Sequence, residues 1–249
     1  MVIHKTHVIA NSKAVSDRRT VLAMSIKFER IGLAPELVDY REAWELQRRV
    51  HEEVTHGNSG PVVFLLEHEA VYTAGRLTEP EDLPVDGTPV IDVDRGGKLT
   101  WHGPGQLVGY AIVRLLDLKG IREYVSVLEE AMIRVSVGYG IPATRIKGRS
   151  GVWVLGTDGT QDRKLGAIGI RVDRGVTMHG FAFNCSNDLS PYAQIIPCGI
   201  TDAGVTSLSV ETGTTITPAD VIDRVEKELE VLLSPIVSLT STKPEGANR

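Results

Sequence analysis

The sequence lacks the features that mark secreted, membrane-spanning or nucleic-acid-coating proteins. It has only 2 cysteines, which excludes a disulfide-stabilised scaffold and favours a reducing compartment. No run of ~18 apolar residues, the length of a membrane span, occurs. The chain has 27 Lys and Arg against 32 Asp and Glu, a net charge of -5 that argues against a protein coating nucleic acid. We therefore expect a cytoplasmic protein with neither a membrane nor a nucleic acid as partner. The oligomeric state is open, with a monomer as the default expectation.

What is present is the composition of an ordinary globular protein. The chain has 249 residues, of which 42% are hydrophobic and 24% charged, enough for a sizeable core without disulfide or metal cross-links. Residues 1–24 lack the ~7–15-residue apolar stretch of a secretory signal, so we expect a disordered leader, with Met24 as an alternative start. We expect one domain over residues 25–233 and a loose polar tail over residues 234–249.

The hydrophobic pattern predicts three helices and about six strands. One helix covers residues 40–56 behind an Asp39 cap, a second covers residues 122–137, and a third starts at Pro218 behind a Thr217 cap. The strands are predicted at residues 62–66, 90–93, 107–116, 152–155, 167–172 and 176–183. Because the strands cluster and do not alternate strictly with helices, the fold class is α+β, with a mixed β-sheet flanked by helices.

The most unusual segment is RGGKLTWHGPGQ, residues 95–106. Four glycines and one proline in twelve residues disfavour a regular core element and let the main chain approach a ligand closely. The segment leads into a strand and not a helix, so it is not a dinucleotide-binding fingerprint. Lys98 is followed by Leu99, not Ser or Thr, so it is not a P-loop. A glycine-rich surface hairpin is the alternative.

Three shorter segments each place one reactive side chain among small residues. They are KLGAIG at 164–169, HGFAFN at 179–184 and PCG at 197–199. Taken alone, Lys164 at the start of a strand is typical of a solvated lysine, and His179 is typical of a partly buried histidine with its hydrogen bonds satisfied. Cys198 lies in a turn and is the better nucleophile candidate, whereas Cys185 ends an apolar strand like an inert buried cysteine. Neither C-x-x-C nor H-x-x-x-H occurs, so we expect no metal.

Together, four ordered motifs resemble those of the lipoyl(octanoyl) transferases. They are RGGKLTWHGPGQLVGY at residues 95–110, KLGAIG at 164–169, HGFAFN at 179–184 and PCGI at 197–200, with a looser match from about residue 28 to 233. The resemblance implies the fold of the biotin and lipoate protein ligases and makes residues 25–233 an octanoyltransferase catalytic domain. It implies transfer of an octanoyl group from octanoyl-acyl carrier protein to a lysine of lipoyl domains. Such domains belong to 2-oxoacid dehydrogenase complexes and to the glycine cleavage H protein.

The resemblance also implies roles for individual residues and no cofactor. Cys198 would carry the acyl group as a thioester, and Lys164 would lower the pKa of that thiol and act as general acid and base. His179 and Asn184 are candidates for support. The octanoyl chain would be bound by Arg95, Gly96, Gly97, Lys98, Leu99, Thr100, Trp101, His102, Ala167, Ile168, Gly169, Gly180, Phe181 and Ala182.

Simple electrostatics is compatible with a pair formed by Cys198 and Lys164. A free thiol has a pKa of ~8.5, and one ammonium ~4 Å away favours the thiolate by up to about 4 kcal/mol at an effective dielectric constant of ~20. A ping-pong reaction between thioesters and an amide needs no nucleotide. Two alternatives stay open: an ATP-dependent lipoate or biotin protein ligase of the same fold, and a non-catalytic module that binds acyl carrier or lipoyl domains.

Overall fold

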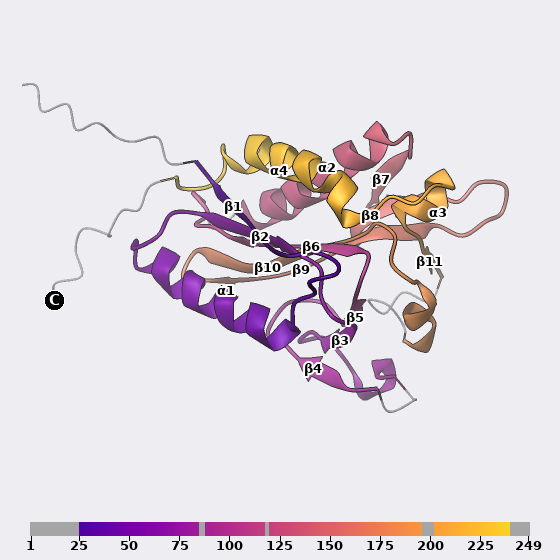
Figure 1. Cartoon of the computed structure of the whole chain (residues 1–249), viewed down its shortest axis with the longest axis horizontal. Coiled ribbons are helices and arrows are strands. Elements are labelled where there is room, and N and C mark those ends of the chain that lie inside the picture. Colours follow the sequence, from indigo (N-terminus) through magenta and orange to yellow (C-terminus); the bar gives the residue numbers. More distant parts are fainter. Residues whose placement is uncertain (1–24, 85–87, 118–119, 196–201, 240–249) are drawn as a thin grey trace, which may run out of the picture.

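The architecture is a large mixed sheet with helices on both faces (Figure 1). The computed structural model describes residues 25–84, 88–117, 120–195 and 202–239. In this part of the chain the large sheet has the order β1-β2-β6-β10-β9-β8-β7, with β11 paired to β9. The pairs β1–β2 and β11–β9 are parallel and the others are antiparallel. The bounds are β1 (Lys27–Gly32), β2 (Val62–Leu66), β6 (Gln106–Ile112), β7 (Ala143–Ile146), β8 (Arg149–Val154), β9 (Arg163–Asp173), β10 (Val176–Asn184) and β11 (Gly204–Val205).

Four α-helices and a small sheet complete the described part of the chain. The helices are α1 (Tyr40–Thr55), α2 (Ile121–Gly138), α3 (Leu208–Thr212) and α4 (Pro218–Leu233), with short 3-10 helices η1 (Pro80–Asp82) and η3 (Ser190–Gln194). The small sheet has the order β4 (Val90–Asp92), β3 (Val71–Ala74), β5 (Leu99–His102). None of these helices is both long enough and apolar enough to cross a membrane.

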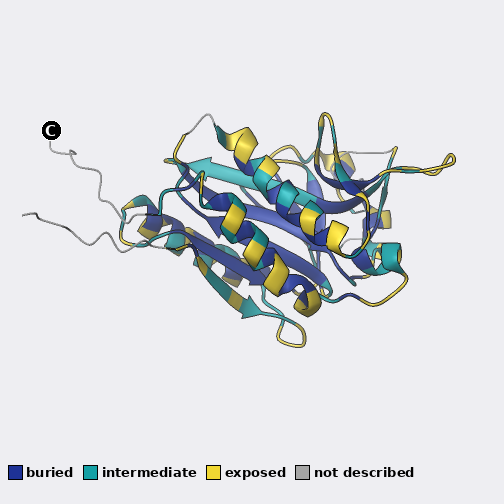
Figure 2. Ribbon diagram, turned by 90° about the horizontal axis from the view of Figure 1, so that it is seen from above, coloured by how far each residue is buried: buried dark blue, intermediate teal, exposed yellow. Residues whose placement is uncertain are grey.

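Strand β2 shows why the predicted apolar run belongs in the middle of the layers. Its alternate residues Val63 and Leu65 pack with α2 and α4, whereas Phe64 and its neighbours on the same side pack with α1. Both sides of the strand are therefore buried, which explains an unbroken apolar sequence instead of an alternating one. Figure 2 shows the same arrangement, with buried strands beneath helices that are exposed only on their outer sides.

The predicted helices are confirmed, together with their N-terminal caps. The Asp39 side chain accepts hydrogen bonds from the backbone N–H groups of Arg41 and Glu42 at the start of α1. Thr217 and Asp220 form a capping box before α4, where Pro218 occupies the first turn. The α+β class with a mixed, helix-flanked sheet is likewise confirmed.

One expectation was wrong: the glycine-rich segment does contain a regular core strand. β5 occupies residues 99–102 inside it, and all four residues are buried. The strand fits between Gly97, which turns the chain at a φ of 82°, and Gly103, so that the glycines flank it without interrupting it. The segment thus combines a turn for close approach with a short strand.

The chain stays packed beyond α4. Val237 is buried and forms a bridge with Leu115, although it belongs to the segment predicted as a loose tail. The leader at residues 1–24 and residues 240–249 lie outside the described residues.

Candidate active site

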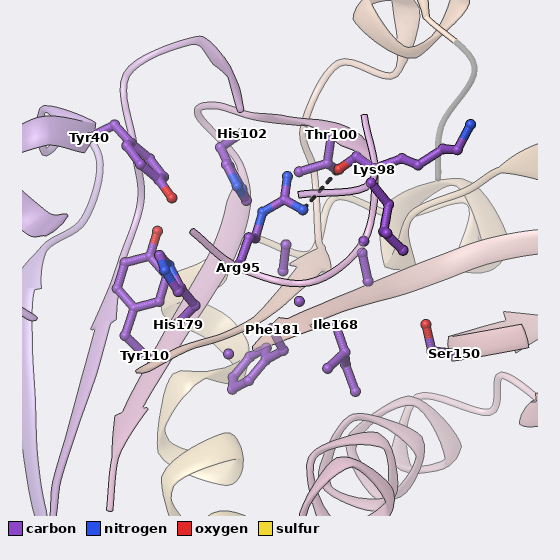
Figure 3. Close-up of a pocket in the computed structure, with 16 residues that line it drawn as sticks. Tyr40, Arg95, Lys98, Thr100, His102, Tyr110, Ser150, Ile168, His179 and Phe181 are labelled. Carbon is purple, nitrogen blue, oxygen red and sulfur yellow. Dashed lines mark hydrogen bonds between the residues drawn. The ribbon is translucent and has the colours of Figure 1, made fainter. Parts of the chain in front are cut away.

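A cavity of about 230 Å³ is lined by residues of β5 in the small sheet and of β6, β8, β9 and β10 in the large sheet (Figure 3). Exposure decreases along it. Ser150 is exposed at one end, whereas Tyr40, Tyr110 and His179 are buried at the other. The cavity is therefore a pocket with a mouth and a closed floor. Its lining comprises Tyr40, Leu77, Arg95, Gly97, Lys98, Thr100, His102, Tyr110, Ser150, Ala167, Ile168, Gly169, His179, Gly180, Phe181 and Ala182.

Strand alternation decides which residues of β5 face this pocket. Thr100 and His102 line it. Leu99 and Trp101 lie on the other side of the strand, in a cluster that includes Tyr192. Half of the strand thus belongs to the pocket and half to a separate apolar cluster.

Arg95 holds the glycine-rich turn in place. Its guanidinium donates to the carbonyl oxygens of Gly96 at 3.0 Å and Lys98 at 2.9 Å. It also donates to the carbonyl oxygen and the hydroxyl of Thr73, at 2.7 and 2.9 Å. The side chain is 6% exposed, so these contacts form in a nearly dry environment. Arg95 therefore fixes the turn by hydrogen bonds within the protein, which is a structural role at the pocket wall.

Glycines thin the wall that β9 and β10 provide. A Cβ on Gly180 would lie 2.1 Å from the carbonyl oxygen of Gly109 on the neighbouring strand β6. A side chain at this position is excluded, so the backbone itself forms the wall. Between these bare backbone stretches, Ile168 and Phe181 supply apolar surface that an alkyl chain can contact.

The floor of the pocket is a set of buried, neutral aromatic side chains. The Tyr40 ring stacks on His102, with centroids 5.8 Å apart. Behind them, His68 donates from Nδ1 to the Val38 carbonyl oxygen, so its Nε2 accepts from the Tyr110 hydroxyl at 2.8 Å. Burial raises the pKa of Tyr40 to about 12, raises that of Tyr110 well above its usual value and lowers that of His68 to about 4. It also lowers the pKa of His102 well below its usual value. All four groups are therefore uncharged at neutral pH.

His179 has a backbone conformation that differs from that of its strand neighbours. Phe181 and Phe183 point from β10 toward α2 and α4, but His179 contacts Trp44 of α1 on the other side of the sheet. Its φ of 58° accounts for this reversal and is uncommon for a residue with a side chain. Its Nε2 donates to the Asp94 carboxylate at 2.7 Å. This bond, with further help from Arg171, holds the pKa of Asp94 well below its usual value, while burial lowers the pKa of His179.

A chain of amide hydrogen bonds connects the floor to the Lys164 region. Gln106 is fully buried and accepts from His102 Nδ1 at 2.8 Å through its Oε1. Its Nε2 donates to the Asn184 side-chain oxygen at 2.9 Å. Asn184 in turn donates to the Thr206 carbonyl oxygen, and the Thr206 N–H donates to the Lys164 carbonyl oxygen, both at 2.9 Å. Because every amide orientation is fixed by its neighbours, the network is rigid.

Lys164 is buried beside the mouth of the pocket. It lines a small second cavity together with Thr100, Ala167 and Ala182, which also line the main pocket. Its side chain is 7% exposed and its Nζ lies 5.0 Å from the centre of the Trp153 ring. It forms no salt bridge with any residue that the structure describes. The expectation of a solvated lysine is therefore wrong, because its ammonium is held close to the pocket.

The two cysteines differ in what the structure reports. Cys185 is fully buried and burial raises the pKa of its thiol, as expected for an inert cysteine. Cys198 lies outside the described residues, so its predicted approach to Lys164 stays a prediction. Among described residues no group of three or more His, Cys, Asp or Glu side chains is placed to hold a metal ion.

Most residues predicted to bind the acyl chain meet at one pocket. Gly96, Leu99 and Trp101 do not line it, and Asn184 lines the small cavity beside Lys164. The lining residues Tyr40, Leu77, Tyr110 and Ser150 were not predicted. Tyr110 is the last residue of the motif RGGKLTWHGPGQLVGY, so the motif could have indicated it. The other three residues come from elements that lie elsewhere in the sequence. The roles of all these residues stay predictions.

Comparison with known proteins agrees with the fold and with the motifs. The family described as Lipoyl protein ligase A/B catalytic domain matches residues 39–230. The octanoyltransferase of Paenarthrobacter aurescens is 58% identical over 224 residues, 90% of this chain and 99% of that protein.

Solved structures share the fold at low sequence identity. The bi-partite lipoate protein ligase of Thermoplasma acidophilum, from a study that includes its E2 lipoyl domain, has a TM-score of 0.59 at 14% identity and covers 85% of this chain and 83% of its own. Lipoate-protein ligase A bound with ATP has a TM-score of 0.55 at 13% identity and covers 85% of each chain. The sequence match covers most of the chain, and the shared fold agrees with it. This chain therefore belongs to the octanoyltransferases, acyltransferases that carry the lipoyl protein ligase A/B catalytic domain.

Proposed function

We propose that this protein transfers an octanoyl group from octanoyl-acyl carrier protein to a lysine of lipoyl domains through a thioester on Cys198. The observation that carries the proposal is a partly apolar pocket with a closed floor and a buried lysine beside its mouth. Lipoyl domains of 2-oxoacid dehydrogenase complexes and the glycine cleavage H protein are the proposed acceptors. We place the reaction in the cytoplasm and assign it to a monomer.

The size and lining of the pocket suit a medium-length alkyl chain. An engineered apolar cavity of about 150 Å³ is enough to bind benzene, which has six carbons. At about 230 Å³ this pocket has room for two further carbons and a carbonyl group. Phe181 and Ile168 provide apolar contact, and each buried methylene contributes about 0.8 kcal/mol to binding. The pocket thus supplies the affinity for the acyl group.

Chain connectivity allows Cys198 to reach Lys164. Cys198 follows Ile195 by three residues, which limits their separation to roughly 11 Å. Ile195 belongs to the same apolar cluster as Tyr192, and Tyr192 lines the small cavity beside Lys164. On the other side, Val205 pairs directly with Lys164 in the β11–β9 ladder. Both ends of the segment that carries Cys198 are therefore anchored close to the lysine.

The proposed reaction has two half-reactions that share one thioester. The Cys198 thiolate attacks the carrier thioester, the new carbon–sulfur bond forms, and the carrier leaves as a thiol after taking a proton from Lys164. The amine of the lipoyl-domain lysine then attacks the Cys198 thioester, forms the amide and releases the thiolate. Lys164 takes back the proton that the amine loses. No nucleotide is consumed, because an amide is more stable than a thioester.

The test is intact mass after incubation with octanoyl-carrier protein. We expect one octanoyl group on wild type and none on Cys198→Ala, with Cys185→Ala as the control that keeps the adduct. Lys164→Ala should slow alkylation of Cys198 at neutral pH. Full transfer by Cys198→Ala would contradict the thioester. Transfer of free octanoate that requires ATP would favour a ligase, and carrier binding without any transfer would favour a binding module.

A further inference from the structure

We infer that the floor of the pocket, formed by Tyr40, His102, Tyr110 and His179, limits the length of the acyl chain to the eight-carbon class. The inference rests on the proposed function in one respect, that the pocket holds the alkyl chain. The floor is a specificity-determining surface, with Tyr40 as its replaceable part. Four observations support it: its place in the pocket, its distance from Lys164, its rigidity and its polarity.

The floor lies at the end of the pocket opposite to Lys164. Lys164 lies beside Gly151, where an added Cβ would come 2.9 Å from the lysine Cε. Gly151 adjoins Ser150, which lines the exposed mouth of the pocket. In Figure 3, Tyr40 and Tyr110 lie at the other side of the pocket from Ser150, with the remaining lining between them. An acyl chain whose carbonyl carbon lies near Lys164 therefore points its terminal methyl group at the floor.

The ladder between β6 and β10 measures the distance. At one end Asn184 of β10, which lines the small cavity of Lys164, pairs with Gln106, and at the other end Gly180 pairs with Tyr110, the floor residue that β6 carries. These rungs are four residues apart, or roughly 13 Å at ~3.3 Å per residue. Carbon–carbon bonds near 1.5 Å make an extended eight-carbon chain roughly 9 Å long and a twelve-carbon chain roughly 14 Å long. The first fits between the rungs and the second reaches Tyr110.

The floor cannot easily yield to a longer chain. Tyr110 is held by its hydrogen bond to His68, and His102 by its bond to Gln106. Tyr40 is the first residue of α1 and packs against both His68 and His102, with ring centroids 5.0 and 5.8 Å apart. Each of these side chains is at most 6% exposed. Moving one of them breaks a buried hydrogen bond or a ring contact.

The polarity of the floor opposes a longer alkyl chain as well. Since His102 donates from Nδ1 to Gln106, its Nε2 carries a lone pair, and the Tyr40 and Tyr110 hydroxyls face one another at the same end of the pocket (Figure 3). A methyl group pressed against these groups would strip them of water and return no hydrogen bond. Shape and polarity thus set the same limit.

The test measures the binding of saturated fatty acids of six to fourteen carbons to the whole protein by calorimetry. In wild type we expect affinity to rise about fourfold per carbon, the factor for one buried methylene, and to fall once the chain exceeds ten carbons. In Tyr40→Ala the fall should move to longer chains, so that the ratio of dodecanoate to octanoate affinity rises at least tenfold. Tyr40→Phe keeps the ring and removes only the hydroxyl, so that ratio should rise less than in Tyr40→Ala. Tyr40→Leu is a second opening variant for the case that the alanine variant unfolds.

The outcomes separate the floor from the proposed function. A continuous rise in wild-type affinity through fourteen carbons would overturn the inference without any variant. So would an unchanged ratio in a folded Tyr40→Ala or Tyr40→Leu protein that still binds octanoate. If octanoate does not bind wild type at all, the acyl pocket of the proposed function is refuted together with its floor. If the ratio shifts as expected while no transfer occurs, the floor stands and the transfer reaction fails.

Discussion

Replacing Arg95 by methionine tests whether this arginine holds the pocket wall or contacts the acyl substrate. The substitution keeps a flexible, unbranched apolar stem and removes all four hydrogen bonds to Thr73, Gly96 and Lys98. Thr73 is fully buried, so its two acceptors lose about 1–3 kcal/mol each, whereas the Gly96 and Lys98 carbonyls lie nearer to solvent and lose less. We expect the free energy of unfolding to fall by about 4 kcal/mol and Tm to fall by about 10 °C.

The assay is urea unfolding, with Arg174→Met as the matched control. Arg174 forms a salt bridge with Glu52 on the surface, where its side chain is 45% exposed, and its loss should cost less than about 1 kcal/mol. Arg95→Lys should recover less than half of the loss, because one ammonium cannot reproduce the planar fork of the guanidinium. An Arg95→Met protein that is as stable as wild type but binds octanoate poorly would refute the structural role.

Three other predictions concern packing and pH. Gly180→Ala should cost more than about 3 kcal/mol of stability, because its Cβ would meet a main-chain oxygen at 2.1 Å. Gly120→Ala is the control: its Cβ would meet no atom nearer than 3.7 Å, so stability should change by less than about 1 kcal/mol. Equal losses for the two variants in urea unfolding would contradict this prediction. Stability should decrease as pH falls from about 6.5 to about 4, because in this range His68 becomes protonated in the unfolded chain but stays neutral in the folded protein. This lowers the free energy of unfolding by about 3 kcal/mol. His68→Gln should remove this contribution from the pH profile of unfolding. Leu99→Ala should lower stability by about 2–4 kcal/mol, because Leu99 is fully buried. Thr100→Ala should keep stability within about 1 kcal/mol of wild type and should weaken octanoate binding instead. The reverse pattern would show that β5 faces the other way.

Local sequence signals predicted the elements whose conformation depends on local chemistry. Asp39 before an amphipathic stretch and Thr217-Pro218 before another located two helix starts, because caps act within one turn. The run at residues 62–66 identified a strand buried on both sides. β5 was missed because glycine content was weighed over the whole segment, while a four-residue strand depends only on its own residues and on its partner β3.

The lining residues of the pocket were predictable where they belong to one motif. They were unpredictable where they come from elements far away in the sequence. Thr100, Ile168 and Phe181 all stand in motifs that were singled out. Tyr40 was assigned only as the start of a helix, and nothing in its neighbourhood indicates that it stacks on His102 from across the fold. The burial of Lys164 was likewise hidden, since it results from Trp153 on a neighbouring strand and from the space left by a glycine.

The amide chain from His102 through Gln106 and Asn184 to Thr206 has a practical meaning for redesign. The same few side chains brace His102 in the proposed floor and β9, the strand that carries Lys164. A protein engineer who wishes to accommodate bulkier cargo should therefore alter Tyr40, which stands outside this relay, and leave Gln106 untouched. Because Gln106 is hydrogen-bonded toward both His102 and Asn184, its replacement would disturb both ends of the chain, whereas Tyr40 can be replaced without breaking it.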